Sequence, residues 1–121
     1  MTIRIRTADL SSEITKLLRE YTTDVEEGLE QAKAQVAKET AELLRRTSPR
    51  KTGSYAKGWR AGRQGRAAVV YNATDYQLTH LLEKGHAKRG GGRVPGIPHI
   101  GPAEEYAIQR FEDEVYKVIQ R

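Results

Sequence analysis

Apolar side chains recur at helical spacing through the first third of the chain. Nine positions form this stripe: Ile14, Leu18, Tyr21, Val25, Leu29, Ala32, Val36, Thr40 and Leu43. They span 29 residues in eight steps, or about 3.6 residues per step, which is the period of an α-helix. The pattern therefore predicts a helix over about residues 11–46, roughly 54 Å long at 1.5 Å per residue.

The flanking residues predict where this helix begins and ends. Asp9, Ser11 or Ser12 is expected to cap its start, and Thr47-Ser48-Pro49 is expected to end it, because the residue before a proline avoids helical angles. Gly28 costs about 1 kcal/mol relative to alanine inside a helix, so we expect a break near residues 22–28. The stripe is too long to pack against the remaining 75 residues, and we expect part of it to contact another subunit.

After Pro49 the spacing of apolar residues changes from helical to alternating. Residues 54–63 and 66–72 are predicted to form two strands joined by a tight turn at Gln64-Gly65. In the first predicted strand Tyr55, Lys57, Trp59 and Ala61 would share one face. A small antiparallel sheet is therefore expected to follow the long helix.

Three further elements are predicted in the second half of the chain. A short helix over about residues 75–84 ends at Gly85, a typical terminating residue. Residues 85–101 hold six glycines and two prolines, which predicts a flexible loop without regular structure. A last helix starts with Pro102 at its first position. Its packing face is expected to comprise Ala107, Phe111, Val115 and either Val118 or Ile119. Residues 1–121 are thus predicted to form one α+β domain.

Charge is distributed unevenly along the chain, whose formal net charge is +5. Residues 9–42 carry nine acidic and four basic side chains, whereas residues 43–74 carry eight basic side chains and no acidic one. Such a pattern is typical of nucleic-acid binding, but equally of a chain that docks onto copies of itself or onto an acidic neighbour. No apolar run is long enough to cross a membrane, and without cysteine the chain has no disulfide or thiolate chemistry. We expect a soluble protein made in the cytoplasm.

The residues that could carry catalysis or metal binding form no known motif. His80, His86 and His99 lack metal-ligand spacing, and we expect them at the surface or at an interface. The Gly90-Gly91-Gly92 run fits no phosphate-binding loop. No catalytic residue, metal site or cofactor is therefore predicted.

The basic hairpin is a candidate binding surface. Arg60, Arg63 and Arg66 are expected to face another subunit or DNA, and nearby aromatic rings could stack on bases. Trp59 is more often a core residue than a stacking platform in a domain this small. A small basic cytoplasmic nucleic-acid-binding protein remains the alternative interpretation.

Three short motifs occur in order along the chain. The first, at residues 48–53, contains Pro49, Thr52 and Gly53. The second, at residues 80–86, contains Glu83 and Gly85, and the third, at residues 98–103, contains Pro98 and Pro102. Together they resemble the tail-completion or head–tail joining (neck) proteins of tailed phages, typified by the tenth gene product of a lambda-like coliphage. The resemblance covers roughly residues 35–110.

Two positions depart from that family's pattern. Lys84 stands where the family often has an aromatic residue, and His99 stands where it often has phenylalanine. We expect these differences to alter local packing.

The resemblance implies a structural virion protein of a phage or prophage, not an enzyme. Such a protein is expected in the neck of the virion, and in the host cytoplasm during assembly. It would form a ring, with six copies expected, between a head-closure (stopper) protein and a tail terminator or tube protein. Lys88, Arg89 and Arg93 in the glycine-rich segment are expected to serve docking. A basic channel face would attract passing DNA without reading its sequence.

Overall fold

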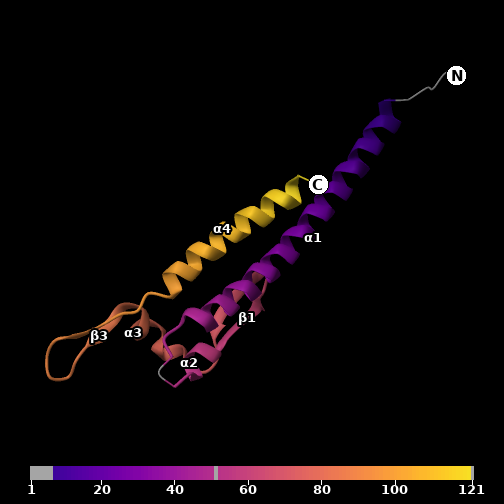
Figure 1. Cartoon of the computed structure of the whole chain (residues 1–121). Helices are drawn as coiled ribbons and strands as arrows, with labels where there is room; N and C mark the ends of the chain where they lie inside the picture. Colours follow the sequence, from indigo (N-terminus) through magenta and orange to yellow (C-terminus); the bar gives the residue numbers. More distant parts are fainter. Residues whose placement is uncertain (1–6, 51, 121) are drawn as a thin grey trace.

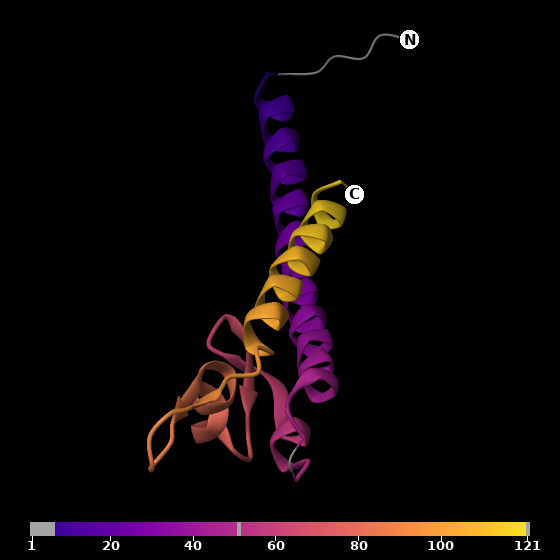
Figure 2. The same cartoon turned by 60° about the vertical axis from the view of Figure 1, so that its left-hand side comes forward.

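The computed structural model describes residues 7–50 and 52–120, which form an elongated α+β fold (Figure 1). The elements in chain order are α1 (Thr7–Thr47), α2 (Ser54–Lys57), β1 (Trp59–Gln64), β2 (Ala67–Asn72), the 3-10 turn η1 (Tyr76–Leu78), α3 (Thr79–Lys84), β3 (Gly85–Ala87), β4 (Arg93–Pro95) and α4 (Ile100–Ile119). The two long helices run antiparallel, and the small elements gather around the C-terminal end of α1 (Figures 1 and 2).

Helix α1 is continuous over 41 residues, or about 60 Å. The expected break near residues 22–28 is therefore wrong. A Cβ atom on Gly28 would lie 2.7 Å from Cγ1 of Val118, so glycine is needed here to let α4 approach and not to end the helix. The expected cap was also misplaced, because α1 begins at Thr7 and Asp9, Ser11 and Ser12 lie within it.

Residues 54–63 do not form one strand, contrary to the sequence prediction. Gly53 has a φ of 86°, and residues 54–57 form the single helical turn α2 before β1 begins at Trp59. The amide of Asn72 holds this turn, since its Nδ2 donates to the carbonyl of Tyr55 at 2.8 Å. Strands β1 and β2 are paired from Trp59↔Asn72 to Gln64↔Ala67, which places the turn one residue later than predicted, at Gly65-Arg66.

The glycine-rich segment contains a short antiparallel hairpin, so the prediction of no regular structure in residues 85–101 is wrong. Strands β3 and β4 pair Gly85 with Pro95 and Ala87 with Arg93. A Cβ atom on Gly85 would lie 2.2 Å from the Val94 carbonyl oxygen, and one on Gly96 would lie 2.3 Å from the Glu83 carbonyl oxygen. Glycine at these two positions therefore permits the close backbone approach on which the pairing depends.

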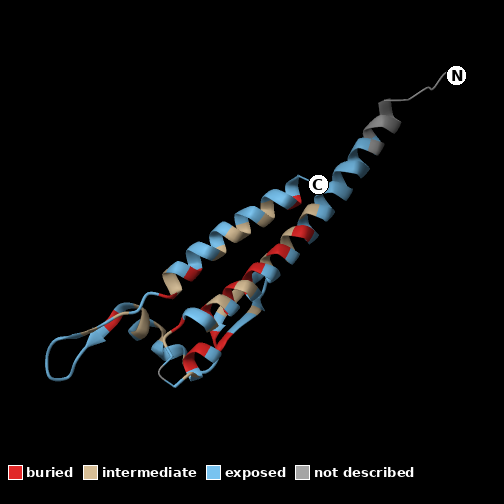
Figure 3. Ribbon diagram, viewed as in Figure 1, coloured by how far each residue is buried: buried red, intermediate tan, exposed pale blue. Residues whose placement is uncertain are grey.

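The buried core lies where the C-terminal end of α1 meets α2, β1 and the start of α4. It contains Leu44, Tyr55, Trp59 and Ala103. The indole N–H of Trp59 donates to Ser48 Oγ at 2.8 Å, which confirms the tryptophan as a core residue. Burial is concentrated here and along the middle of α1, whereas residues 14–24 of α1 are exposed (Figure 3).

Helix α4 packs along α1 through the predicted apolar face. Val118 is buried and Ile119 is exposed, which settles the choice between them. The helix begins at Ile100, so Pro102 occupies its third position and not the first. Proline is still tolerated there, because the backbone N–H groups of a first turn have no partner within the helix.

Candidate assembly surfaces

The three arginines of the basic hairpin do not form one free patch. Arg63 makes an ion pair with Glu30 of α1. Arg60 donates through Nη1 to the Trp59 carbonyl at 3.0 Å. Arg66 is exposed, and its side chain makes no ion pair or hydrogen bond among the described residues.

The acidic helix and the basic hairpin contact each other within one chain. Lys33 Nζ lies 2.6 Å from Glu30 Oε1 and donates to the carbonyl of Arg66 at 2.8 Å. The Lys33 hydrogen bond, together with the charges of Lys33 and Arg63, lowers the pKa of Glu30 and outweighs the opposing effect of burial. These contacts attach the β1–β2 hairpin to α1.

The β3–β4 hairpin carries the predicted docking residues at two different places. Lys88 and Arg89 lie at its exposed tip, where the Lys88 N–H donates to the Gly92 carbonyl at 3.0 Å. Arg93 is the first residue of β4 and pairs with Ala87, and its Nη2 donates to the Lys84 carbonyl at 3.0 Å. The hairpin projects from the body of the molecule (Figure 1), so its tip is available for contact.

Glu83, the residue before Lys84 at the end of α3, binds the backbone at the start of α4. Its Oε1 accepts hydrogen bonds from the backbone N–H groups of His99 at 2.7 Å and Ile100 at 2.8 Å, and its Oε2 accepts from Gly101 at 3.0 Å. Burial raises the pKa of the Glu83 carboxyl, but these backbone donors and the nearby His99 outweigh it, so the pKa falls below its ordinary value. Glu83 thus caps α4 from a different element.

His99 is buried, with only 2% of its surface exposed, so the expectation of a surface or interface histidine is wrong for this residue. Its Nδ1 lies 2.7 Å from the carbonyl oxygen of Ile97 and 3.0 Å from Glu83 Oε1. Its Nε2 lies 2.7 Å from the hydroxyl of Tyr55. Sequence reasoning missed this role, although the position of His99 next to a helix start, where the resembling family often has phenylalanine, was a usable signal.

The remaining motif residues and histidines differ in how far they are exposed. Thr52 is exposed, and its hydroxyl accepts from the Ser54 N–H at 3.4 Å. Pro49 is half-buried, while Pro98 and Pro102 are exposed. His80 and His86 are also exposed, and among residues 7–50 and 52–120 no three histidine or acidic side chains gather in a way that could hold a metal ion.

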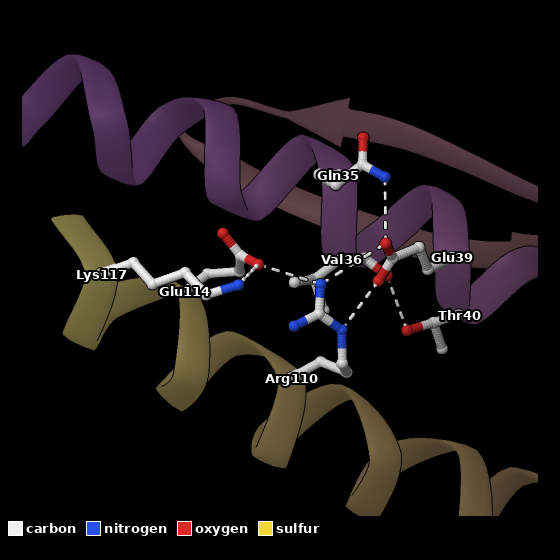
Figure 4. Close-up of polar contacts among 7 residues, drawn as sticks. All are labelled: Gln35, Val36, Glu39, Thr40, Arg110, Glu114 and Lys117. Carbon is white, nitrogen blue, oxygen red and sulfur yellow. Dashed lines mark hydrogen bonds and ion pairs between the residues drawn. The ribbon is translucent and has the colours of Figure 1, made fainter.

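A polar bridge joins the two long helices (Figure 4). Arg110 Nε lies 3.0 Å from Glu39 Oε2 on α1, and Arg110 Nη2 lies 3.0 Å from Glu114 Oε1 on α4. A hydrogen bond from Gln35, followed by those from Arg110, lowers the pKa of Glu39. The bridge fixes α4 against α1 near the middle of the helix pair.

An apolar ridge is exposed on the N-terminal part of α1. It consists of Ile14, Leu17, Leu18 and Tyr21, whose exposed fractions are 47%, 56%, 61% and 49%. Helix α4 ends alongside α1 before reaching most of this ridge (Figures 1 and 2). Within the part of the chain that the structure describes, no helix combines the length and apolar character of a membrane span.

A second apolar surface lies between α1, β2 and α4, where an open groove has a volume of about 370 Å³. We call it the lateral groove. Most of its lining is apolar, and the residues are Lys33, Val36, Ala37, Thr40, Ala67, Ala68, Val70, Ala107, Ile108 and Phe111. The ridge and the lateral groove thus lie on different parts of the same molecule.

Comparison with known proteins identifies one family. The family model described as "Bacteriophage HK97-gp10, putative tail-component" matches residues 12–85, which is more than half of the chain. The match runs from α1 through both strands of the first hairpin to Gly85. No curated protein and no solved structure gave a significant match.

Proposed function

Because the chain belongs to the HK97-gp10-like family of phage tail components, we propose that it completes the tail and joins it to the head connector. It would do so as a structural protein of the virion neck. The family match supports a tail component. The place in the neck rests on the motifs around Pro49, Glu83 and Pro98.

We propose that the protein acts as a ring, with six copies expected. The observation that carries this proposal is the apolar ridge of α1, because its four large apolar side chains stand in helical register and remain about half exposed. Among them only the Tyr21 hydroxyl makes a hydrogen bond in the described part of the chain, donated to the Ile119 carbonyl at 3.4 Å. A surface of this kind on a soluble helix is typical of a subunit interface. The long antiparallel pair of α1 and α4 supplies the rigid body that a ring requires.

The β3–β4 hairpin is the part proposed to dock onto neighbouring proteins, namely the head-closure protein or the tail terminator or tube protein. Lys88 and Arg89 place two positive charges at its tip, Arg93 adds a third on β4 next to the tip, and Lys84 adds a fourth just before its base. Glu83, the acidic residue closest in sequence, is turned inward to cap α4. An acidic surface on the partner would therefore meet an unopposed positive charge.

Contact with passing DNA is a further part of the proposal. Six copies at +5 each would carry a charge of about +30, which attracts phosphates without base recognition. The alternative of a dedicated nucleic-acid-binding monomer has less support, since two of the three aromatic residues that could stack on bases, Trp59 and Tyr55, are buried in the core. The third, Tyr71, is exposed. Arg63 is already paired with Glu30.

The test is whether the purified protein assembles and restores joining to tails made without it. Light scattering and negative-stain microscopy would follow ring formation, alone and on such tails. Charge reversal at Lys88 and Arg89 should abolish joining but leave the fold intact, as judged by circular dichroism. The matched control reverses Lys38 and Arg46, two exposed charges on α1, and should join normally.

Two results would contradict the proposal. One is normal joining by the Lys88/Arg89 variant, which would remove the docking role of the hairpin. The other is a monomer that never binds tails but binds DNA with a steep dependence on salt, which would favour the nucleic-acid-binding alternative.

A further inference from the structure

We infer that the lateral groove receives the apolar ridge of a second copy of this chain. The inference rests on the proposed self-assembly and specifies which two surfaces meet. Ile14, Leu17, Leu18 and Tyr21 of one copy would enter the groove that α1, β2 and α4 form in the next copy.

The ridge cannot reach the groove of its own chain. Leu18 and Val36 lie on the same unbroken helix, and 18 residues at 1.5 Å per residue separate them by about 27 Å along its axis. A continuous helix cannot fold back over that distance. A ridge that fills a groove must therefore come from another molecule.

The spacing of the ridge fits a groove of this kind. Its residues stand at positions i, i+3, i+4 and i+7, the arrangement by which amphipathic helices insert into apolar grooves. A cavity of about 150 Å³ holds a benzene molecule, so a groove of about 370 Å³ has room for at least two large side chains. Ile108 on the groove wall is itself 54% exposed and lacks a covering neighbour.

The charges beside the two surfaces are complementary. Glu20 and Asp24 are exposed next to the ridge, and no hydrogen bond or ion pair engages them among the described residues. Arg66 is exposed at the turn next to Ala67, where β2 forms one wall of the groove. Acidic residues would therefore approach a free arginine as the ridge enters.

The contact would join two different surfaces, so it is a head-to-tail interface. Each copy then offers a ridge to one neighbour and a groove to the other. Such a contact continues from copy to copy and closes into a ring when the rotation between neighbours permits.

The absence of cysteine in the chain allows a direct test by disulfide cross-linking. Two single variants, Leu18→Cys and Ile108→Cys, are mixed and oxidised, both in solution and on tails. A disulfide requires Cβ atoms about 4 Å apart, so it reports close packing of the two surfaces. We expect a cross-linked product of doubled mass from the mixture and little from either variant alone.

The control replaces Leu18→Cys with Lys16→Cys, which lies about 160° around α1 from Leu18. Its mixture with Ile108→Cys should lose the cross-link. The double variant Leu18→Cys/Ile108→Cys should form a ladder of oligomers, since each copy can then link to two neighbours.

Three outcomes would overturn the inference, and each has a different meaning for the proposed function. Efficient cross-linking of Leu18→Cys alone would show that two ridges pair symmetrically. Rings that form without the mixed cross-link would show that another surface joins the copies, and the proposed assembly would stand. A protein that assembles neither in solution nor on tails would remove the proposed ring and this inference together.

Discussion

The hydroxyl of Tyr55 lies 2.7 Å from Nε2 of His99, and both side chains are buried. Nδ1 of His99 faces two acceptors, the carbonyl of Ile97 and the carboxylate of Glu83, so this nitrogen carries the proton and Nε2 accepts from Tyr55. Burial, with a contribution from the charge of Glu83, raises the pKa of Tyr55 to about 12, so the hydroxyl stays protonated at neutral pH. The pair ties α2 to the start of α4.

Replacing His99 by phenylalanine should destabilise the fold by about 1–3 kcal/mol, because the Tyr55 hydroxyl would be left buried without a partner. Adding Tyr55→Phe should recover part of the loss, since both members of the hydrogen bond are then apolar. Urea unfolding of the two single variants and the double variant measures the coupling. Independent, additive effects would show that the hydrogen bond contributes nothing.

Replacing Glu83 by glutamine should cost about 2 kcal/mol, since three backbone N–H groups lose a charged acceptor. Thermal unfolding at neutral pH measures this effect. The exposed Glu104→Gln serves as the control, because the side chain of Glu104 has no such partners in the described part of the chain and a surface change of this kind stays within about 0.5 kcal/mol.

The stabilisation by Glu83 should also depend on pH. Its pKa is lowered in the folded chain, so the contribution is complete above the ordinary value of 4.5 and is lost as the pH falls through the folded pKa. The difference in stability between the native chain and Glu83→Gln should therefore shrink below about pH 4.5. A difference that stays constant from pH 7 to pH 3 would contradict the role of the charge.

Gly28→Ala should destabilise the chain even though alanine favours helix by about 1 kcal/mol. The new Cβ would lie 2.7 Å from Cγ1 and 3.0 Å from Cγ2 of Val118, and this β-branched side chain has little freedom to move. In a Val118→Ala background the clash is removed, so Gly28→Ala should stabilise the chain relative to Val118→Ala alone. If Gly28→Ala alone raised the melting temperature, close packing at this crossing would be disproved.

The interhelical pair of Arg110 and Glu39 should contribute only a small stabilisation, because both side chains remain 25% exposed and solvent weakens their attraction. A double-mutant cycle with Arg110→Met and Glu39→Gln isolates this coupling from the contact of Arg110 with Glu114. The coupling should fall in high salt. Lys117→Met, at an exposed ion pair, provides the matched comparison and should have a smaller effect.

The elements of regular periodicity could be predicted from the sequence. The stripe from Ile14 to Leu43 requires a helix whatever surrounds it, and the α+β order follows from the change of period after Pro49. Gly28 was misjudged because its helical cost is a local property. The benefit of its missing side chain appears only when Val118, 90 residues later, lies against it.

The candidate sites were also misjudged where they depend on contacts between residues that are far apart in sequence. Composition alone suggested that residues 85–101 lack regular structure, yet Gly85 and Gly96 make the β3–β4 pairing possible. Glu30, the partner of Arg63, lies 33 residues away in sequence, and Tyr55, one of the partners of His99, lies 44 residues away, so neither contact could be predicted from local spacing. Exposure of the α1 ridge could be anticipated, since it followed from the length of the stripe.

The two ends of the β3–β4 hairpin differ in how far they tolerate substitution by larger residues. At its base, Gly85 and Gly96 face backbone atoms so closely that no larger residue fits. At its tip, a side-chain carbon added to Gly90 would meet nothing within 4 Å, and Lys88 and Arg89 beside it are exposed. Substitutions at these three tip positions should therefore leave the backbone contacts of Gly85 and Gly96 at the base unchanged. Under the docking role proposed for this tip, related phages could change these residues to match new neighbouring proteins at little cost in folding, because the base that holds the hairpin on the body stays the same.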